Sequence, residues 1–99
     1  STHMKLADIK KELLKAIKYE DNVMVAVKVY DADEGEQTYD VEVNYYIDGH
    51  YADTLVSDIF YAGDLTKAVK RGKVVLKSVA NWLAGHEVRV ATDVEVYTN

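Results

Sequence analysis

The sequence predicts a single α+β domain in which two helices pack on one face of an antiparallel sheet. Three observations support this fold class. Apolar residues recur at helical spacing near the N-terminus and again between residues 64 and 84. Between and after these segments, apolar residues alternate with polar ones in the manner of strands. An Asp48-Gly49 pair separates two strand-like runs, and this dipeptide is typical of a two-residue hairpin turn.

The first predicted helix covers residues 5–19. Leu6, Ile9, Leu13 and Ile17 share one face, and lysines occupy the other. Turn-forming residues at 20–22 end it. We interpret residues 1–3 as the remnant of an expression tag, so the predicted domain covers residues 4–99.

Two strands are predicted next. Alternate valines from Val23 to Val29 form the inner face of the first strand, with Tyr30 on the outer face. A polar connector at residues 31–36 leads to a second strand over residues 37–47. The outer face of this second strand includes Asp40, Glu42 and Tyr46.

The segment from His50 to Tyr61 fits either a strand or a helix, because its apolar residues satisfy both spacings. We predict a strand, since the Asp-Gly turn requires a partner for the strand before it.

A second helix is predicted over residues 64–84, with Asp64 as N-cap and Gly85 as C-cap. Gly72 lies in the middle of its apolar face, which indicates a close approach to the sheet. A last strand over residues 86–97 then places alternate residues inward, from Val88 through Thr92 to Val96. The predicted order is therefore α-β-β-β-α-β.

Composition narrows the functional class. The chain has 99 residues and no cysteine, which excludes disulfides and cysteine-ligated zinc. It contains no apolar run of the roughly 18 residues that span a bilayer, and we expect a cytoplasmic protein. His50 and His86 have no second ligand at metal-binding spacing, and no Gly-rich phosphate loop or G-x-S-x-G motif is present. We therefore expect neither an enzyme, nor a cofactor, nor a metal site.

The acidic connector partly matches a calcium-binding loop. Asp31, Asp33 and Glu42 occupy positions 1, 3 and 12 of an EF-hand frame, but its required Gly position is Glu36. We interpret this segment as a solvated hairpin loop.

Charge is separated along the chain, whose formal net charge is -5. Residues 29–66 carry ten acids and no Lys or Arg, whereas residues 67–86 carry five basic residues and no acid. Such patterns predict binding partners rather than fold.

The order α-β-β-β-α over residues 5–84 resembles the double-stranded-RNA-binding domain. In that family the second helix begins with basic residues that bind phosphates, and residues 66–71 stand in that place. The Lys-Lys pair of the family is missing, and the 31–36 loop is acidic. The resemblance implies nucleic-acid binding through Lys67, Lys70, Arg71 and Lys77.

A different surface is predicted on the outer face of the sheet. Asp40 and Glu42 lie about 6.7 Å apart on one strand face, of the order of neighbouring phosphates on DNA. Tyr30, Tyr46 and Tyr97 are interleaved with carboxylates, as is common at protein interfaces. This acidic, tyrosine-rich, cysteine-free chain resembles the DNA-mimicking inhibitor proteins of bacteriophages in composition and charge layout.

The first functional hypothesis is thus a non-enzymatic acidic domain that binds a basic protein. A specific form of this hypothesis is a nucleic-acid mimic that inhibits a DNA- or RNA-binding protein of a host. The predicted partner-binding residues are Asp31, Asp33, Glu34, Glu36, Asp40, Glu42, Tyr46, Asp48, Asp58, Asp93 and Glu95. The alternatives are the nucleic-acid binder described above and a small structural or assembly protein. Self-association into a homodimer is compatible with the apolar residues on both faces of the 50–61 segment.

Overall fold

The computed structural model describes residues 3–31, 38–61 and 63–98. Its elements follow the order α1 (Leu6–Ile17), β1 (Val23–Asp31), β2 (Thr38–Ile47), β3 (His50–Tyr61), α2 (Leu65–Leu83), β4 (Val88–Val90) and β5 (Glu95–Tyr97). The α+β class and the α-β-β-β-α-β order are confirmed, with the last predicted strand present as two short strands.

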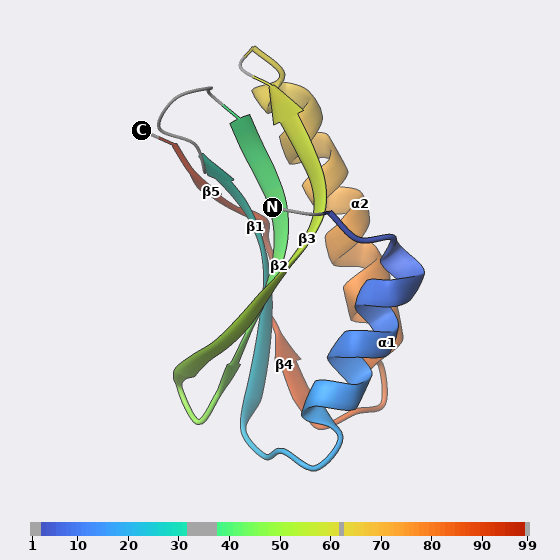
Figure 1. Cartoon of the computed structure of the whole chain (residues 1–99). Helices are drawn as coiled ribbons and strands as arrows, with labels where there is room; N and C mark the ends of the chain where they lie inside the picture. The colour runs from blue at the N-terminus through green and yellow to red at the C-terminus, as the bar shows by residue number, and fades with distance from the viewer. Residues whose placement is uncertain (1–2, 32–37, 62, 99) are drawn as a thin grey trace.

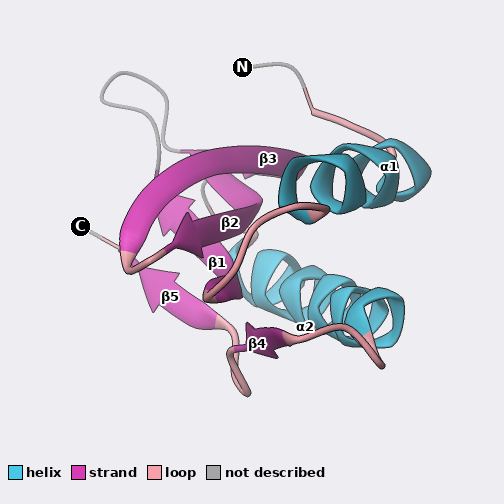
Figure 2. Ribbon diagram, turned by 90° about the horizontal axis from the view of Figure 1, so that it is seen from below, coloured by secondary structure: helices cyan, strands magenta, loops and turns pink. Residues whose placement is uncertain are grey.

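The strands form one twisted sheet, and both helices lie on the same side of it (Figure 1). Seen along the helices, α1 and α2 run side by side, and β3 curves along the edge of the sheet that lies next to α1 (Figure 2). No element among the described residues covers the sheet face that is turned away from the helices. None of the described helices is long and apolar enough to cross a lipid bilayer.

The sheet is mixed, so the prediction of a wholly antiparallel sheet is wrong. The strand order is β3-β2-β1-β4, with β5 also paired to β1. The β1–β2 and β2–β3 pairs are antiparallel, whereas β4 and β5 run parallel to β1. The reason is α2, whose 19 residues carry the chain back about 28 Å at 1.5 Å per residue. The next strand therefore starts at the end where β1 starts.

The hairpin between β2 and β3 has the predicted turn. Asp48 and Gly49 both adopt positive φ angles, 52° and 78°, as a type I′ turn requires. Ile47 consequently pairs with His50 and Tyr46 with Tyr51. The prediction that residues 50–61 form a strand is confirmed. Register shifts at Val41/Glu42 and Tyr45/Tyr46 interrupt the β2–β3 ladder, and bulges of this kind bend a strand.

The break between β4 and β5 is a second irregularity. Val25 pairs with Val90 and Lys28 with Glu95, so β1 advances by fewer residues than the strand beside it. The extra residues bulge out of the ladder between Val90 and Glu95. Thr92, which was expected to point inward, is exposed in this bulge.

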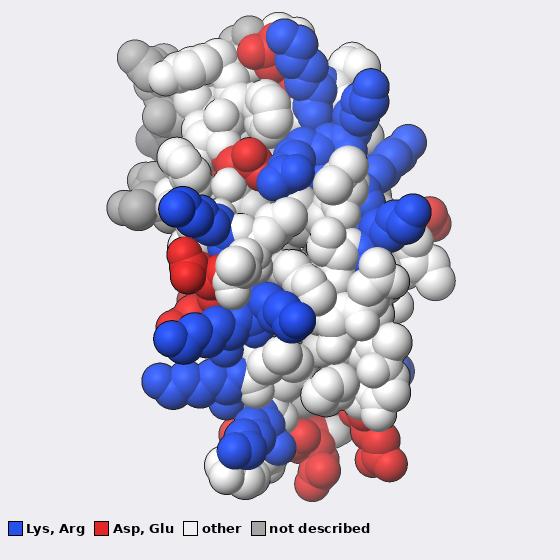
Figure 3. All heavy atoms as spheres, turned by 90° about the vertical axis from the view of Figure 1, so that its right-hand side faces the viewer, with Lys and Arg blue, Asp and Glu red and all other residues white. Residues whose placement is uncertain are grey.

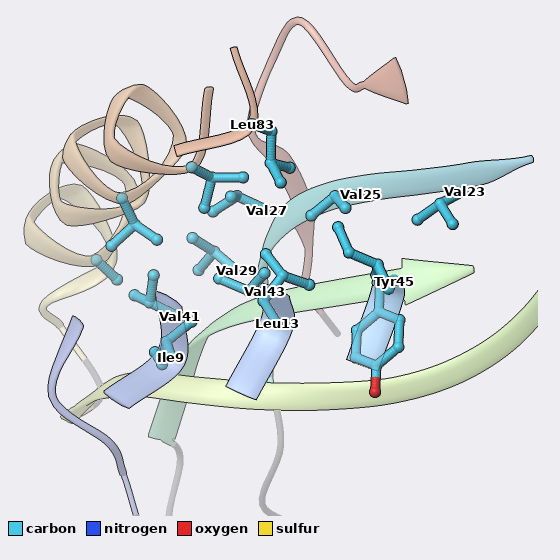
Figure 4. Close-up of a cluster of buried hydrophobic side chains, with 14 residues drawn as sticks. Ile9, Leu13, Val23, Val25, Val27, Val29, Val41, Val43, Tyr45 and Leu83 are labelled. Atoms are coloured by element: carbon cyan, nitrogen blue, oxygen red, sulfur yellow. The ribbon is translucent and has the colours of Figure 1, made fainter. Parts of the chain in front are cut away.

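The core lies between the helices and the sheet (Figure 4). The helix-facing valines of β1 form its centre and are at most 1% exposed: Val23, Val25, Val27 and Val29. Ile9 and Leu13 of α1 reach the same layer and are fully buried. Alternation on β1 and helical spacing on α1 therefore placed the correct residues inward.

Gly72 faces the sheet, as its position in the apolar face of α2 predicted. A Cβ atom at Gly72 would lie 3.1 Å from Val94 Cγ1 and 3.4 Å from Val29 Cγ2. The helix thus approaches the sheet where residue 72 has no side chain. At the helix ends, Asp64 and Ala84 are the caps and Gly85 follows with φ of 85°.

Gly72→Leu should lower the free energy of unfolding by about 1–3 kcal/mol, because the added side chain overpacks the contact with Val29 and Val94. Chemical denaturation measures this change. Asn81→Leu, on an exposed turn of the same helix, should have a much smaller effect. A stabilised Gly72→Leu protein would show that α2 presents another face to the sheet.

Candidate functional site

The sheet face turned away from the helices carries five of the eight tyrosines. Register places them together, because Tyr30 pairs with Tyr97 and Tyr46 with Tyr51. We call this surface the tyrosine face; its tyrosines are Tyr30, Tyr46, Tyr51, Tyr61 and Tyr97. Four of them are largely exposed, from 43% for Tyr30 to 65% for Tyr61. The rings of Tyr46 and Tyr51 meet edge to face, with centroids 6.1 Å apart.

The middle of the tyrosine face is polar but buried. Asp40, Glu42 and Asn44 lie on β2 and are 6%, 8% and 1% exposed. β2 is flanked by β1 and β3, so each of its residues has a neighbour on both sides. Glu42, for example, pairs with Lys28 on β1 and with Val56 on β3. The sequence placed Asp40 and Glu42 on the correct face, but as solvated carboxylates, and their burial corrects that expectation.

A chain of hydrogen bonds satisfies part of this buried layer. Thr54 Oγ1 donates to Asn44 Oδ1, and the Asn44 amide donates to Glu42 Oε1 over 3.4 Å. Tyr51 Oη lies 2.7 Å from Thr54 Oγ1. Because the only hydroxyl hydrogen of Thr54 is directed at Asn44, Tyr51 is the donor to Thr54. All the donors therefore point toward the Glu42 carboxylate.

Lys28 sits beside the same carboxylate. Its Nζ lies 4.0 Å from Glu42 Oε1, and 5.0 Å and 5.1 Å from the ring centroids of Tyr30 and Tyr97. The ammonium group is thus held between two aromatic rings and a carboxylate, a combination of cation–π and ionic attraction. The tyrosine face can hold a cation in this way.

Charge and burial shift two ionisations on this face. Burial raises the pKa of Glu42, and the charge of Asp40 adds to this, while the Asn44 hydrogen bond and Lys28 act in the opposite direction. The charge of Glu95 raises the pKa of Tyr97, whose hydroxyl also donates to Glu95 over 3.2 Å. The Glu42 carboxylate is therefore a site where an additional cation would be favourable.

The other acids predicted to bind a partner do not join a single surface. Asp58 faces the helices and accepts from Arg71 Nε over 2.8 Å. Asp48 lies exposed in the β2–β3 turn and Asp93 in the β4–β5 bulge. Asp31 ends β1 on the helix side, paired with Tyr39. Asp33, Glu34 and Glu36 lie outside the described residues.

Of the predicted basic residues of α2, Arg71 differs from the lysines because it pairs with Asp58. Lys67, Lys70 and Lys77 are exposed, and Lys67 lies 3.7 Å from Asp64. Arg71 is only partly exposed, because its guanidinium binds Asp58. It therefore does not lie on a free basic face as expected.

Tyr51, Tyr61 and Lys28 were not among the site residues predicted from the sequence. Tyr51 could have been found, because a two-residue Asp-Gly turn fixes its pairing with Tyr46. Tyr61 could have been found as well, because the two register shifts in the β2–β3 ladder cancel, and Tyr61 lies on the same face as Tyr51.

Hollows also lie elsewhere on the described surface. One of about 520 Å³ is lined by Glu20, Asp21 and His86, among others. Another of about 500 Å³ lies between α2 and the β4–β5 segment, lined by Leu76, Ala80 and Val94 with Lys73 and Lys77 at its rim. Among the described residues, no group of three or more His, Asp or Glu side chains could hold a metal ion.

Comparison with protein-family models, curated proteins and solved structures finds no match to this chain.

Burial of Glu42 should make stability depend on pH. Its pKa is raised above the ordinary value of 4.5, so its contribution to stability is full below that value and is lost as pH rises through the raised pKa. Glu42→Gln removes this loss. The melting temperature of Glu42→Gln minus that of wild type should therefore increase from about pH 4 to about pH 8.

Glu87→Gln, a change at an exposed glutamate, is the control and should follow the wild-type profile. A difference between Glu42→Gln and wild type that stays constant with pH would contradict the buried, charged position of Glu42.

Proposed function

We propose that the protein is a non-enzymatic binding module, and that its tyrosine face binds a basic protein partner. The observation that carries this proposal is the gathering of five tyrosines around two buried carboxylates, on a sheet face that no described element covers.

The tyrosines supply the contact area. Tyrosine is enriched at protein interfaces because its ring buries a large apolar surface while its hydroxyl can still hydrogen-bond. Tyr51 and Tyr61 are 60% and 65% exposed. Exposed rings grouped on one uncovered face are typical of residues that dominate binding energy.

The carboxylates favour a basic partner. Asp40, Glu42 and Glu95 lie on this face, and Lys28 lies beside Glu42. The raised pKa of Glu42 reflects its burial near Asp40, and a guanidinium or ammonium group from a partner would reduce that electrostatic cost. The placement of Lys28 between Tyr30 and Tyr97 illustrates how a partner's cation can be held.

The structure changes how this surface could resemble a nucleic acid. Asp40 and Glu42 are too buried to present charges as phosphates do, so the tyrosines form the contact and the carboxylates form its charged floor. A nucleic-acid-binding protein remains the proposed class of partner, because such proteins present clustered Lys and Arg.

The test is a comparative capture from a bacterial lysate at low and high salt, quantified by mass spectrometry. The proteins used are wild type, Tyr46→Ser with Tyr51→Ser, Asp40→Asn with Glu42→Gln, and Tyr19→Ser. Tyr19 is 88% exposed but lies outside the tyrosine face, so it is the matched control. Wild type and Tyr19→Ser should both capture basic proteins, and high salt should weaken this capture. Both double variants should fail to capture these proteins.

Two results would contradict the proposal. One is capture of the same basic proteins by the tyrosine double variant and by wild type. The other is capture of further copies of this chain alone, which would assign the face to self-assembly. Circular dichroism of each variant checks that the fold is retained.

A further inference from the structure

A second charged surface lies on the opposite side of the molecule. Nine exposed lysines belong to α1, α2 and the residues that flank α1: Lys5, Lys10, Lys11, Lys15, Lys18, Lys67, Lys70, Lys73 and Lys77. We call them the lysine layer. Figure 3 views the molecule from the side of the helices, and Lys and Arg side chains gather there in two groups.

Basic and acidic residues are divided unequally between the helices and the rest of the chain. Residues 5–18 and 64–83 hold ten of the twelve Lys and Arg residues but only three of the seventeen acids. One of these acids, Asp64, already lies near Lys67. The helices of an acidic protein therefore present a net positive surface to solvent.

The lysines form two rows that point away from the sheet. On α2, Lys67, Lys70, Lys73 and Lys77 are spaced by three or four residues, so they share one helix face and extend about 15 Å along it. On α1, Lys11, Lys15 and Lys18 follow the same spacing. Each row lies opposite the buried residues of its helix, and the helices run side by side (Figure 2).

The composition of this layer fits phosphates better than a protein surface. Protein interfaces have an apolar centre and are depleted in lysine, whereas contact with a nucleic-acid backbone needs only cationic groups near phosphates. Val74 is the exposed large apolar residue described on α2. Arg71, which could otherwise bind two acceptors at once, is engaged by Asp58.

We infer that the lysine layer binds a nucleic-acid duplex through its phosphates, without reading base sequence. A duplex carries one charge per about 1.7 Å of its axis, so each row of lysines spans several phosphates. This inference is independent of the proposed function, because it uses the opposite face of the molecule.

The overall negative charge does not prevent such binding. Most of the acids belong to the strands and their connections rather than to the helices. The Debye length is about 8 Å at physiological ionic strength, which is close to the thickness of one layer of secondary structure. Acids on the far side of the sheet are therefore largely screened from a duplex bound to the helices.

The experiment is a fluorescence-anisotropy titration of the full chain with labelled DNA duplexes of two unrelated sequences, and with an RNA duplex, over a series of salt concentrations. We expect similar affinity for the two DNA sequences and a steep loss of affinity with salt. Comparison of the RNA duplex with the DNA duplexes shows which kind of duplex the lysine layer binds more tightly.

The variants are Lys70→Gln with Lys77→Gln on α2, and Lys11→Gln with Lys15→Gln on α1. Each lysine that contacts a phosphate should reduce the slope of log affinity against log salt by about 0.9. Arg89→Glu is the matched control, because it changes the net charge by the same amount on β4. It should leave that slope unchanged, as should Tyr46→Ser with Tyr51→Ser.

Three results would overturn the inference. The first is failure of both duplex types to bind at low salt. The second is an equal effect of Arg89→Glu and the lysine pairs, which would indicate net charge rather than a surface. The third is binding of a polyglutamate peptide as tight as that of the duplexes, which would assign the layer to an acidic protein.

Discussion

The packing of both helices against one face of the sheet is the constraint on which the remaining structure depends. The inward valines of β1 are at most 1% exposed, and this burial of apolar side chains is the main favourable contribution to folding. The absence of a side chain at Gly72 lets α2 approach Val29 and Val94 closely. Since α2 crosses the sheet on this side, the chain returns beside β1 and runs parallel to it as β4 and β5. The same packing leaves the opposite sheet face without cover from any described element.

The two surfaces of the molecule follow from this one-sided packing. The helix positions that face away from the sheet carry exposed lysines, and these side chains form a positive layer on one side of the molecule (Figure 3). Strand positions that face away from the helices carry tyrosines and carboxylates on the other side. The Arg71–Asp58 pair joins the helix layer to β3 across the core side, so these two charges stabilise the fold and are not available to partners. The fold therefore rests on the apolar interface between the two layers, and the two proposed binding surfaces lie on the outer sides of these layers.

Local patterns in the sequence correctly predicted the features that depend on residues close together in the chain. Alternation identified the inward valines, Asp48-Gly49 identified the hairpin, and Gly72 identified the close contact of α2. The direction of the last strand was missed because it depends on where a whole helix returns the chain. The burial of Asp40 and Glu42 was missed because it depends on the strands that flank β2 on both sides, which the alternation within β2 does not reveal. The pairing of Asp58 with Arg71 joins a strand to a helix across 13 sequence positions, which no local pattern specifies.

The central claim is that the tyrosine face is open in the free protein and becomes covered by a basic partner. Line broadening of ring-labelled tyrosines by a soluble nitroxide tests it most directly, because broadening reports solvent access to each ring. In the free protein, Tyr30, Tyr51, Tyr61 and Tyr97 should broaden strongly, as should Tyr19, while the buried Tyr45 should not. With the captured partner added, the first four should be protected and Tyr19 should remain broadened. Protection of those four rings in the free protein, or their continued broadening in the complex, would contradict the account.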